Sequence, residues 1–381
     1  MNIVSKLPHV GTTIFTTMSA LAVEHGALNL GQGFPSFPVD PVWGDLVKKY
    51  IDKGFNQYAP MPGVPELRQA IAGKIQHTYH QSADPNTEIT VTSGATQAIF
   101  TAINALVHPG DEVILFAPAY DCYAPAVELA GGVVKWVELT FPEYQIPWDI
   151  VKDTISEKTR MILINHPHNP TGASISKSDI VALENAVRGT NIIVLSDEVY
   201  EHILFDGREH HSVWKSDELR ERSIAVYSFG KTFHLTGWKL GYVLARPHLM
   251  AEFRKVHQYN VFSCNTPMQY ALAEYLSTPS HYEVLPSFYQ EKRDLFLGKI
   301  NNPLIKVLPC AGTYFALLDY SALNQNDDVA EAIRWTKEYK LTTIPCSVFY
   351  PNKTDNKVLR VCFAKDENTL QLGADVISGI G

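Results

Sequence analysis

Hydrophobic residues along this chain form two alternating patterns. The run "EITVTS" (88–93) is followed by Ile99, Ala102, Ile103 and Leu106 at helical spacing, and then by a second apolar run, "DEVILF" (111–116). Short β-branched runs are typical of strands, whereas a spacing of three and four residues is typical of amphipathic helices. Their alternation predicts an α/β architecture.

Further strand candidates continue this rhythm through most of the chain. They are "VVKWVEL" (133–139), "RMILIN" (160–165), "IIVLS" (192–196), "SIAVYS" (223–228) and "GYVLA" (241–245). Several are nearly continuous apolar runs, as expected for strands that helices cover on both faces.

After about residue 285 the alternation becomes less dense. A helical stretch, "SFYQEKRDLFLGKI" (287–300), is followed by "GTYFALLDY" (312–320), a second helical pattern around 328–339, and "VLRVCF" (358–363). This part of the chain therefore predicts a smaller α+β domain.

Composition is that of a soluble globular protein. The 381 residues are 45% hydrophobic and 19% charged, with a formal net charge of −8 and no basic run. The absence of a basic stripe argues against nucleic acid and anionic membranes as partners. We find neither a leader-like N-terminus nor an apolar stretch of about eighteen residues that could span a bilayer, and therefore expect a cytoplasmic location.

Cysteines and histidines give no sign of a metal site. The five cysteines are scattered without a C-x-x-C pair, which favours reduced thiols. His166 and His168, and the stretch 209–211, lack the spacing that zinc ligands usually show. We predict no bound metal.

The stretch "SFGKTF" (228–233) contains Gly-Lys-Thr, the end of a nucleotide-binding phosphate loop. Such a loop needs a glycine five positions before Gly230, where this chain has Ala225. The preceding residues predict a strand instead of a loop, so Lys231 needs another explanation.

Polar residues follow several of the predicted strands, at the sheet edge where α/β proteins bind ligands. Ser93 and Gly94 lead into a helix whose first amides, at Ala95 and Thr96, could hold a phosphate. Ser93 could equally act as an ordinary helix cap. Asn169, in the proline-rich loop "NHPHNPTG", could donate to a ligand or satisfy its own turn.

The next two strand ends carry ionisable and nucleophilic side chains. Asp197 ends an apolar strand and needs a cationic or donor partner, and Tyr200 follows three residues later. A structural salt bridge and core packing are the alternative roles for these two residues. Ser228, Lys231 and Lys239 follow the next strand. An amine, a carboxylate, a phenol and a phosphate cradle together suit pyridoxal 5'-phosphate held by a lysine Schiff base.

Nine stretches in order give a specific resemblance. They are "GQGFP", "NQYAPMPGVPELR", "VTSGATQA", "PAYDCY", "NHPHNPTG", "DEVYEH", "SFGKT", "TGWKLGY" and "RVCFAK". The chain resembles, over essentially its whole length, the class I aminotransferases of the pyridoxal-phosphate type I fold. Within them it most resembles bacterial methionine aminotransferases and the kynurenine and glutamine aminotransferases, also through "TTIFTTMSALA" and "VHQYNVFSCNTP".

This resemblance implies a large cofactor-binding domain over residues 41–285, built on a mostly parallel seven-stranded sheet covered by helices. Residues 1–40 and 286–381 would form the small α+β domain. The resemblance also implies a homodimer with shared active sites.

The resemblance assigns cofactor roles to residues already singled out. Lys231 would hold pyridoxal phosphate and then move the proton from the substrate α-carbon, while Asp197 would pair with the ring nitrogen. Tyr200 and Asn169 would contact the ring's phenolic oxygen. Further cofactor contacts would come from Tyr120 against the ring face, from Ala95, Thr96, Ser228 and Lys239 at the phosphate, and from Tyr58 of the neighbouring subunit.

Substrate roles follow in the same way. Arg360, inside the apolar run "VLRVCF", needs a carboxylate partner, or it lies on the solvent face of an edge strand. The resemblance makes it the clamp for the substrate α-carboxylate, assisted by Gly33 and Asn169. Phe15, Phe34, Tyr58 and Phe262 would form an apolar side-chain pocket, although all four could be core residues.

The predicted function is transfer of the amino group of methionine and aromatic amino acids to a 2-oxo acid by a ping-pong reaction. One alternative is a kynurenine or glutamine aminotransferase with β-lyase activity on cysteine conjugates. Another is a non-catalytic regulator on the same fold, against which the presence of Lys231, Asp197, Tyr200 and Arg360 argues.

Overall fold

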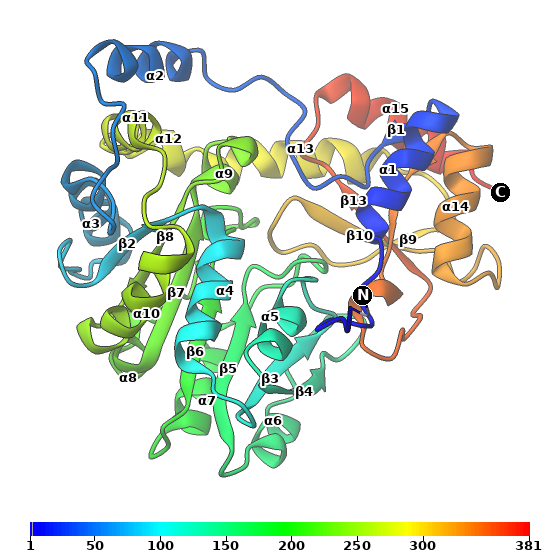
Figure 1. The fold of residues 1–381 in the computed structure, drawn as a ribbon. Coiled ribbons are helices and arrows are strands. Elements are labelled where there is room, and N and C mark those ends of the chain that lie inside the picture. The colour runs from blue at the N-terminus through cyan, green and yellow to red at the C-terminus, as the bar shows by residue number, and fades with distance from the viewer. Residues whose placement is uncertain (2) are drawn as a thin grey trace.

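A seven-stranded sheet forms the centre of the molecule (Figure 1). The computed structural model describes Met1 and residues 3–381. The strand order is β2-β8-β7-β6-β5-β3-β4, and all strands are parallel except β8, which runs antiparallel to both neighbours. The strands are β2 (Ile89–Thr92), β3 (Glu112–Ala117), β4 (Val133–Glu138), β5 (Thr159–Asn165), β6 (Ile193–Asp197), β7 (Ser223–Ser228) and β8 (Gly241–Ala245).

Helices cover both faces of this sheet, as the continuous apolar strands predict. One face packs on α4 (Gly94–Leu106), α5 (Tyr123–Leu129) and α10 (Pro247–Asn260). The other face contributes to the larger core, which includes residues of α3 (Pro65–Tyr79), α7 (Lys177–Val187) and α11 (Thr266–Leu276). The remaining helices of this part are α2 (Val42–Asp52), α6 (Trp148–Thr154), α8 (Asp217–Arg222), α9 (Phe229–Thr232) and α12 (Ser280–Glu283).

The two ends of the chain meet in a second part of the fold. Strand β1 (Leu28–Asn29) pairs in parallel with β11 (Leu341–Thr342). Beside them lies a four-stranded sheet of order β12-β13-β10-β9, formed by β9 (Lys306–Val307), β10 (Phe315–Asp319), β12 (Ile344–Pro345) and β13 (Val358–Cys362). The helices here are α1 (Ile14–His25), α13 (Leu285–Lys299), α14 (Asp328–Glu338) and α15 (Glu367–Ser378). The boundaries at residues 40/41 and 285/286 stay a prediction.

The fold class and the strand positions are confirmed. The predicted strands at 223–228 and 241–245 coincide with β7 and β8, and the other five strands of this sheet differ by one residue at one or both ends. Because β7 is a strand, the backbone before Gly230 does not form a phosphate loop, in agreement with the sequence argument.

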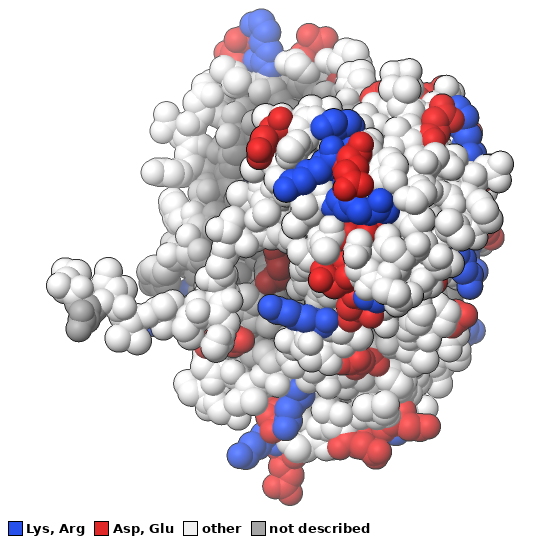
Figure 2. All heavy atoms as spheres, turned by 90° about the vertical axis from the view of Figure 1, so that its right-hand side faces the viewer, with Lys and Arg blue, Asp and Glu red and all other residues white. Residues whose placement is uncertain are grey.

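Charges of both signs are mixed on the face of the molecule shown in Figure 2, where no continuous basic stripe is visible. Among the helices of the described residues, none is long and apolar enough to cross a membrane.

Candidate active site

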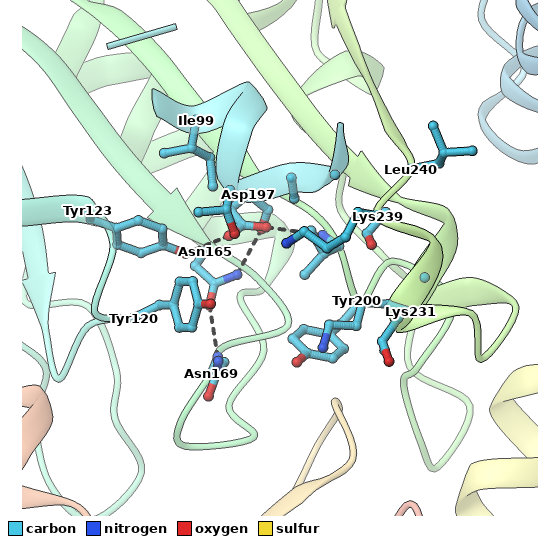
Figure 3. Close-up of a pocket in the computed structure, with 17 residues that line it drawn as sticks. Ile99, Tyr120, Tyr123, Asn165, Asn169, Asp197, Tyr200, Lys231, Lys239 and Leu240 are labelled. Carbon is cyan, nitrogen blue, oxygen red and sulfur yellow. Dashed lines mark hydrogen bonds between the residues drawn. The ribbon is translucent and has the colours of Figure 1, made fainter. Parts of the chain in front are cut away.

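A cavity of about 160 Å³ opens at the carboxyl ends of the parallel strands (Figure 3). It lies where β5, β6 and β7 end and where α4 begins, so residues far apart in sequence meet there. Its lining includes most of the predicted cofactor residues, namely Ala95, Thr96, Tyr120, Asn169, Asp197, Tyr200, Ser228, Lys231 and Lys239. Tyr123 and Asn165, which the sequence analysis did not select, also line it.

The start of α4 has the features of an anion site. The side chain of Ser93 makes no capping hydrogen bond, so the helix-cap alternative is wrong. Gly94 has a φ of 77°, which favours glycine, and a side chain there would meet Lys239 at 3.5 Å. Free N–H groups at a helix N-terminus attract anions, and Lys239 adds a positive charge beside them.

Asp197 is the buried carboxylate of the cavity. The Tyr123 hydroxyl donates to its Oδ2 at 2.6 Å, and the Val199 N–H donates to its Oδ1 at 3.3 Å. Burial raises the pKa of Asp197 to about 6, although both donors oppose this shift. No Lys, Arg or His side chain of the described residues pairs with it within 4 Å, so the salt-bridge alternative is wrong as well.

Lys231 lies on α9, directly after β7. Its Nζ donates to the Tyr314 hydroxyl at 2.7 Å and to the Gly33 carbonyl at 3.3 Å. Burial lowers the pKa of Lys231 to about 8, because the surrounding protein disfavours the charged ammonium. A substantial fraction of the amine is therefore neutral near physiological pH, as a nucleophile and proton acceptor requires.

Arg360 lies on β13, an interior strand of the four-stranded sheet, and is only 1% exposed. The solvent-facing alternative is therefore wrong. Its Nη1 donates to Asn169 Oδ1 at 2.8 Å and its Nη2 to the Gly31 carbonyl at 3.2 Å, but its buried Nε has no partner among the described residues. The expected carboxylate partner is not supplied by the part of the chain that the structure describes.

Aromatic rings surround this guanidinium. Its central carbon lies 3.9 Å from the ring centre of Phe315, 5.3 Å from that of Phe15 and 5.4 Å from that of Phe349. Phe15 thus lies beside Arg360, and its predicted role in the substrate pocket stays a proposal; Phe315 and Phe349 were not anticipated. Gly33 is also close, since a side chain there would collide with the Phe315 ring at 2.7 Å.

Two asparagines connect the predicted cofactor-binding residues with the predicted substrate-binding residues. Asn165 donates to the Asp197 carbonyl at 3.0 Å and accepts the backbone N–H of Asn169 at 2.8 Å (Figure 3). Asn169 in turn accepts from Arg360. The loop after β5 is therefore fixed between Asp197 on one side and Arg360 on the other.

Tyr58, Phe262 and Phe34 do not line the cavity and are exposed in this chain. Tyr58 is 82% exposed and Phe262 is 41% exposed, and their ring centres lie 5.3 Å apart. Tyr58 lines a separate surface hollow. Phe34 is also largely exposed and lies under the ammonium of Lys365. Their predicted roles at the active site stay proposals.

Pyridoxal phosphate fits the groups that this site presents. Asp197, Lys231, Lys239 and Arg360 all lack an oppositely charged side chain within 4 Å among the described residues. An unpaired carboxylate suits the protonated ring nitrogen, the uncapped helix with Lys239 suits the phosphate, and a low-pKa lysine suits the aldehyde.

The fold and these groups define a pyridoxal-phosphate enzyme of the type I fold. Residues 26–377 match the family model of class I and II aminotransferases, and the chain belongs to this family. It is therefore a pyridoxal-phosphate-dependent aminotransferase.

Individual relatives cover almost the whole chain. The chain is 50% identical to methionine aminotransferase of Escherichia coli over 97% of this chain and 96% of that protein. It is 35% identical to kynurenine–oxoglutarate transaminase of Dictyostelium discoideum over 96% and 93% of the two chains. A crystal structure of the E. coli protein YbdL, reported to have a methionine aminotransferase function, superposes with a TM-score of 0.97 at 48% identity, covering 99% of both chains.

Proposed function

We propose that this enzyme transfers the amino group of L-methionine and of aromatic amino acids to a 2-oxo acid. The observation that supports this choice most strongly is the environment of Arg360, a buried cation without a carboxylate partner among the described residues, surrounded by three phenylalanine rings. An α-carboxylate can pair with the guanidinium, while the rings favour an uncharged, apolar side chain over a second carboxylate.

The residues in and beside the cavity have separate binding roles. Arg360 and Asn169 orient the substrate carboxylate, with Gly33 beside them. Ala95, Thr96, Ser228 and Lys239 would hold the cofactor phosphate, Tyr120 would pack on the ring, and Tyr200 and Asn169 would hydrogen-bond to its phenolic oxygen. Asp197 would keep the ring nitrogen protonated.

When bound, the cofactor supplies an electron sink that stabilises negative charge at the substrate α-carbon. Lys231 lies at the cavity wall with a pKa of about 8, and its neutral amine takes the proton from this carbon. Binding the carboxylate at Arg360 fixes which of the bonds at the α-carbon is presented to Lys231.

We also propose a homodimer, since Tyr58 and Phe262 form an exposed aromatic pair outside their own cavity. In the dimer, Tyr58 would reach the phosphate site of the neighbouring subunit, and Phe262 and Phe34 would complete the substrate pocket. Residues 41–285 would form the large domain, with both chain ends in the small one.

Absorbance of the bound cofactor tests the proposed substrate. We expect L-methionine to bleach the visible band of the purified enzyme and a 2-oxo acid to restore it. A band that ignores methionine but responds to kynurenine or glutamine would contradict the substrate choice and leave the enzyme class intact. The relative named kynurenine–oxoglutarate transaminase makes kynurenine the second substrate to test.

A further inference from the structure

Tyr314 makes the shortest contact of the catalytic lysine. The Lys231 Nζ lies 2.7 Å from the Tyr314 hydroxyl oxygen and 3.3 Å from the Gly33 carbonyl oxygen. The Tyr314 hydroxyl also lies 2.7 Å from the same Gly33 carbonyl. The three groups come from different parts of the chain, and they form a closed triangle around the amine.

The donor geometry gives the direction of each bond. The Tyr314 hydroxyl donates its single proton to the Gly33 carbonyl, which can only accept. The hydroxyl oxygen must then accept from Lys231. A neutral amine has two N–H bonds, and the two oxygens use both of them. Its lone pair therefore points away from Tyr314 and Gly33.

The triangle is held rigidly. Tyr314 is fully buried, and its ring packs against Tyr200 at 5.2 Å, Phe315 at 4.9 Å and Tyr289 at 5.8 Å between ring centres. On the opposite side, the Lys365 ammonium donates to the carbonyls of Gln32 and Phe34, which flank Gly33. The Tyr314 hydroxyl and the Gly33 carbonyl, which accept hydrogen bonds from Lys231, therefore cannot move far without breaking these contacts.

We propose that Tyr314 is a positioning residue that, with the Gly33 carbonyl, holds the free ε-amino group of Lys231 and directs its lone pair away from these two oxygens into the cavity. This inference rests on the proposed role of Lys231. It adds a residue that keeps the amine oriented whenever Lys231 is not bonded to the cofactor, which includes the period in which Lys231 moves the substrate proton.

Charged groups around Lys231 act on it without touching it. Asp197 favours the ammonium, whereas Arg360 and Lys239 disfavour it. Tyr314 differs from these three because it is in direct contact with the nitrogen. Removing its hydroxyl should therefore change both the orientation and the proton affinity of the amine.

The test compares Tyr314→Phe with a matched control, Tyr289→Phe. Both substitutions remove one hydroxyl from the same buried aromatic cluster and leave the rings in place. The Tyr289 hydroxyl has no hydrogen-bond partner in the described part of the chain and does not contact Lys231. Melting temperatures of the cofactor-free proteins check that both variants fold.

The measurement is the rate at which cofactor-free enzyme condenses with pyridoxal phosphate, with release of water, followed by absorbance between pH 6 and 10. The rate should rise to a plateau as Lys231 loses its proton. A hydroxyl accepts more strongly from an ammonium than from a neutral amine, so Tyr314→Phe should move the midpoint to lower pH. Its plateau, and kcat with methionine, should fall about tenfold, the upper end of the effect of losing one hydrogen bond between neutral groups.

Each outcome decides the question. A plateau about tenfold below that of Tyr289→Phe, with a lowered midpoint, supports the proposal. A plateau within about twofold of the control, a lower plateau without a shift of the midpoint, or an equal fall in both variants would overturn it. If the wild-type enzyme itself fails to react with pyridoxal phosphate, the proposed function fails instead.

Discussion

The segment from Asp197 to Glu201 lies between two buried regions. In one region the charged side chains have no ionic partner in the part of the chain that the structure describes, and in the other they are paired. Asp197 and Tyr200 line the active-site cavity, where the charged groups have no ionic partner among the described residues. Glu198 and Glu201, from the same short segment, are equally buried but belong to dense networks of ion pairs and hydrogen bonds.

In the region of ion pairs and hydrogen bonds, Glu198 and Glu201 both have charged or hydrogen-bonding partners. Glu198 accepts from the backbone N–H of Val213 at 3.0 Å, from the Tyr227 hydroxyl at 3.0 Å, and lies 2.9 Å from His210 Nε2. Burial alone would raise the pKa of Glu198, but His166 and His210 hold it below its usual range. Glu201 pairs with Lys74 at 2.6 Å and accepts from Tyr79.

Two buried lysines make the contrast concrete. Lys74 has a carboxylate partner and fixes the segment in place, whereas Lys231 has only a hydroxyl and a carbonyl. Charges that are paired within the protein can position a segment, but only charges left unpaired can bind a charged ligand. The difference explains how one short segment is both an anchor and part of an active site.

The largest expected effect comes from removing the unpaired lysine. Lys231→Ala should reduce turnover by about 10⁴-fold or more, since both the proposed nucleophile and the proposed proton acceptor are lost. The urea midpoint of the cofactor-free variant should not fall, because no ion pair is broken. Turnover within about tenfold of wild type would show that another group carries the chemistry.

Removing the paired lysine should instead affect stability. Lys74→Met leaves the buried Glu201 without its cation and should lower the free energy of unfolding by about 3–5 kcal/mol, measured by urea denaturation of the cofactor-free protein. The double variant Lys74→Met/Glu201→Gln serves as the control and should recover most of this loss. A single variant as stable as wild type would contradict the contrast between the two regions.

Asp197→Asn should separate function from stability. The pKa of Asp197 is raised from 3.8 to about 6 by burial, so ionising it in the folded, cofactor-free protein is unfavourable. This cost is absent below about pH 4, grows as the pH rises to about 6, and is constant above. At pH 8 the variant should therefore be more stable than wild type by about 1–3 kcal/mol while losing most turnover. Lower stability of the variant at pH 8 would contradict this.

The smallest predicted effect concerns the donor to Asp197. Tyr123→Phe removes the 2.6 Å hydrogen bond that favours the ionised carboxylate, and should raise the pKa of Asp197 by about one unit. The pH below which the affinity for pyridoxal phosphate falls should rise by the same amount. Tyr227→Phe, which removes a donor to Glu198 in the region of ion pairs and hydrogen bonds, should leave that pH unchanged. Equal shifts in both variants would contradict the assignment.

Much of the fold could be predicted from local pattern alone. Strands such as β7 and β8 are continuous apolar runs, and a run of this kind shows its position directly. Asp197, Asn169 and Lys231 could be selected because they follow strand ends, which meet at one edge of a parallel sheet.

The missed residues depend on contacts between distant segments. Tyr314 meets Lys231 across 83 positions of the chain, and the aromatic ring of Phe315 meets Arg360 from the neighbouring strand. In the sequence both are ordinary apolar members of a strand. Tyr123 stands three residues after Tyr120 in "AYDCY", and this spacing at a strand end was the one signal that could have indicated it.

Arg360 shows a further limit of sequence analysis. A buried guanidinium predicts a carboxylate, but the sequence does not say whether the carboxylate belongs to the protein or to a ligand. The structure supplies Asn169 and Gly31 as partners, and the described residues contribute no acidic side chain within 4 Å.

The most direct test of the central claim is to locate the lysine that bonds to the cofactor. The enzyme is incubated with pyridoxal phosphate, reduced with borohydride, digested and analysed by mass spectrometry. We predict a single pyridoxyl group on Lys231, with Lys74 and Lys239 unmodified. Modification of another lysine in place of Lys231, or none at all, would contradict the assignment of this cavity as the active site.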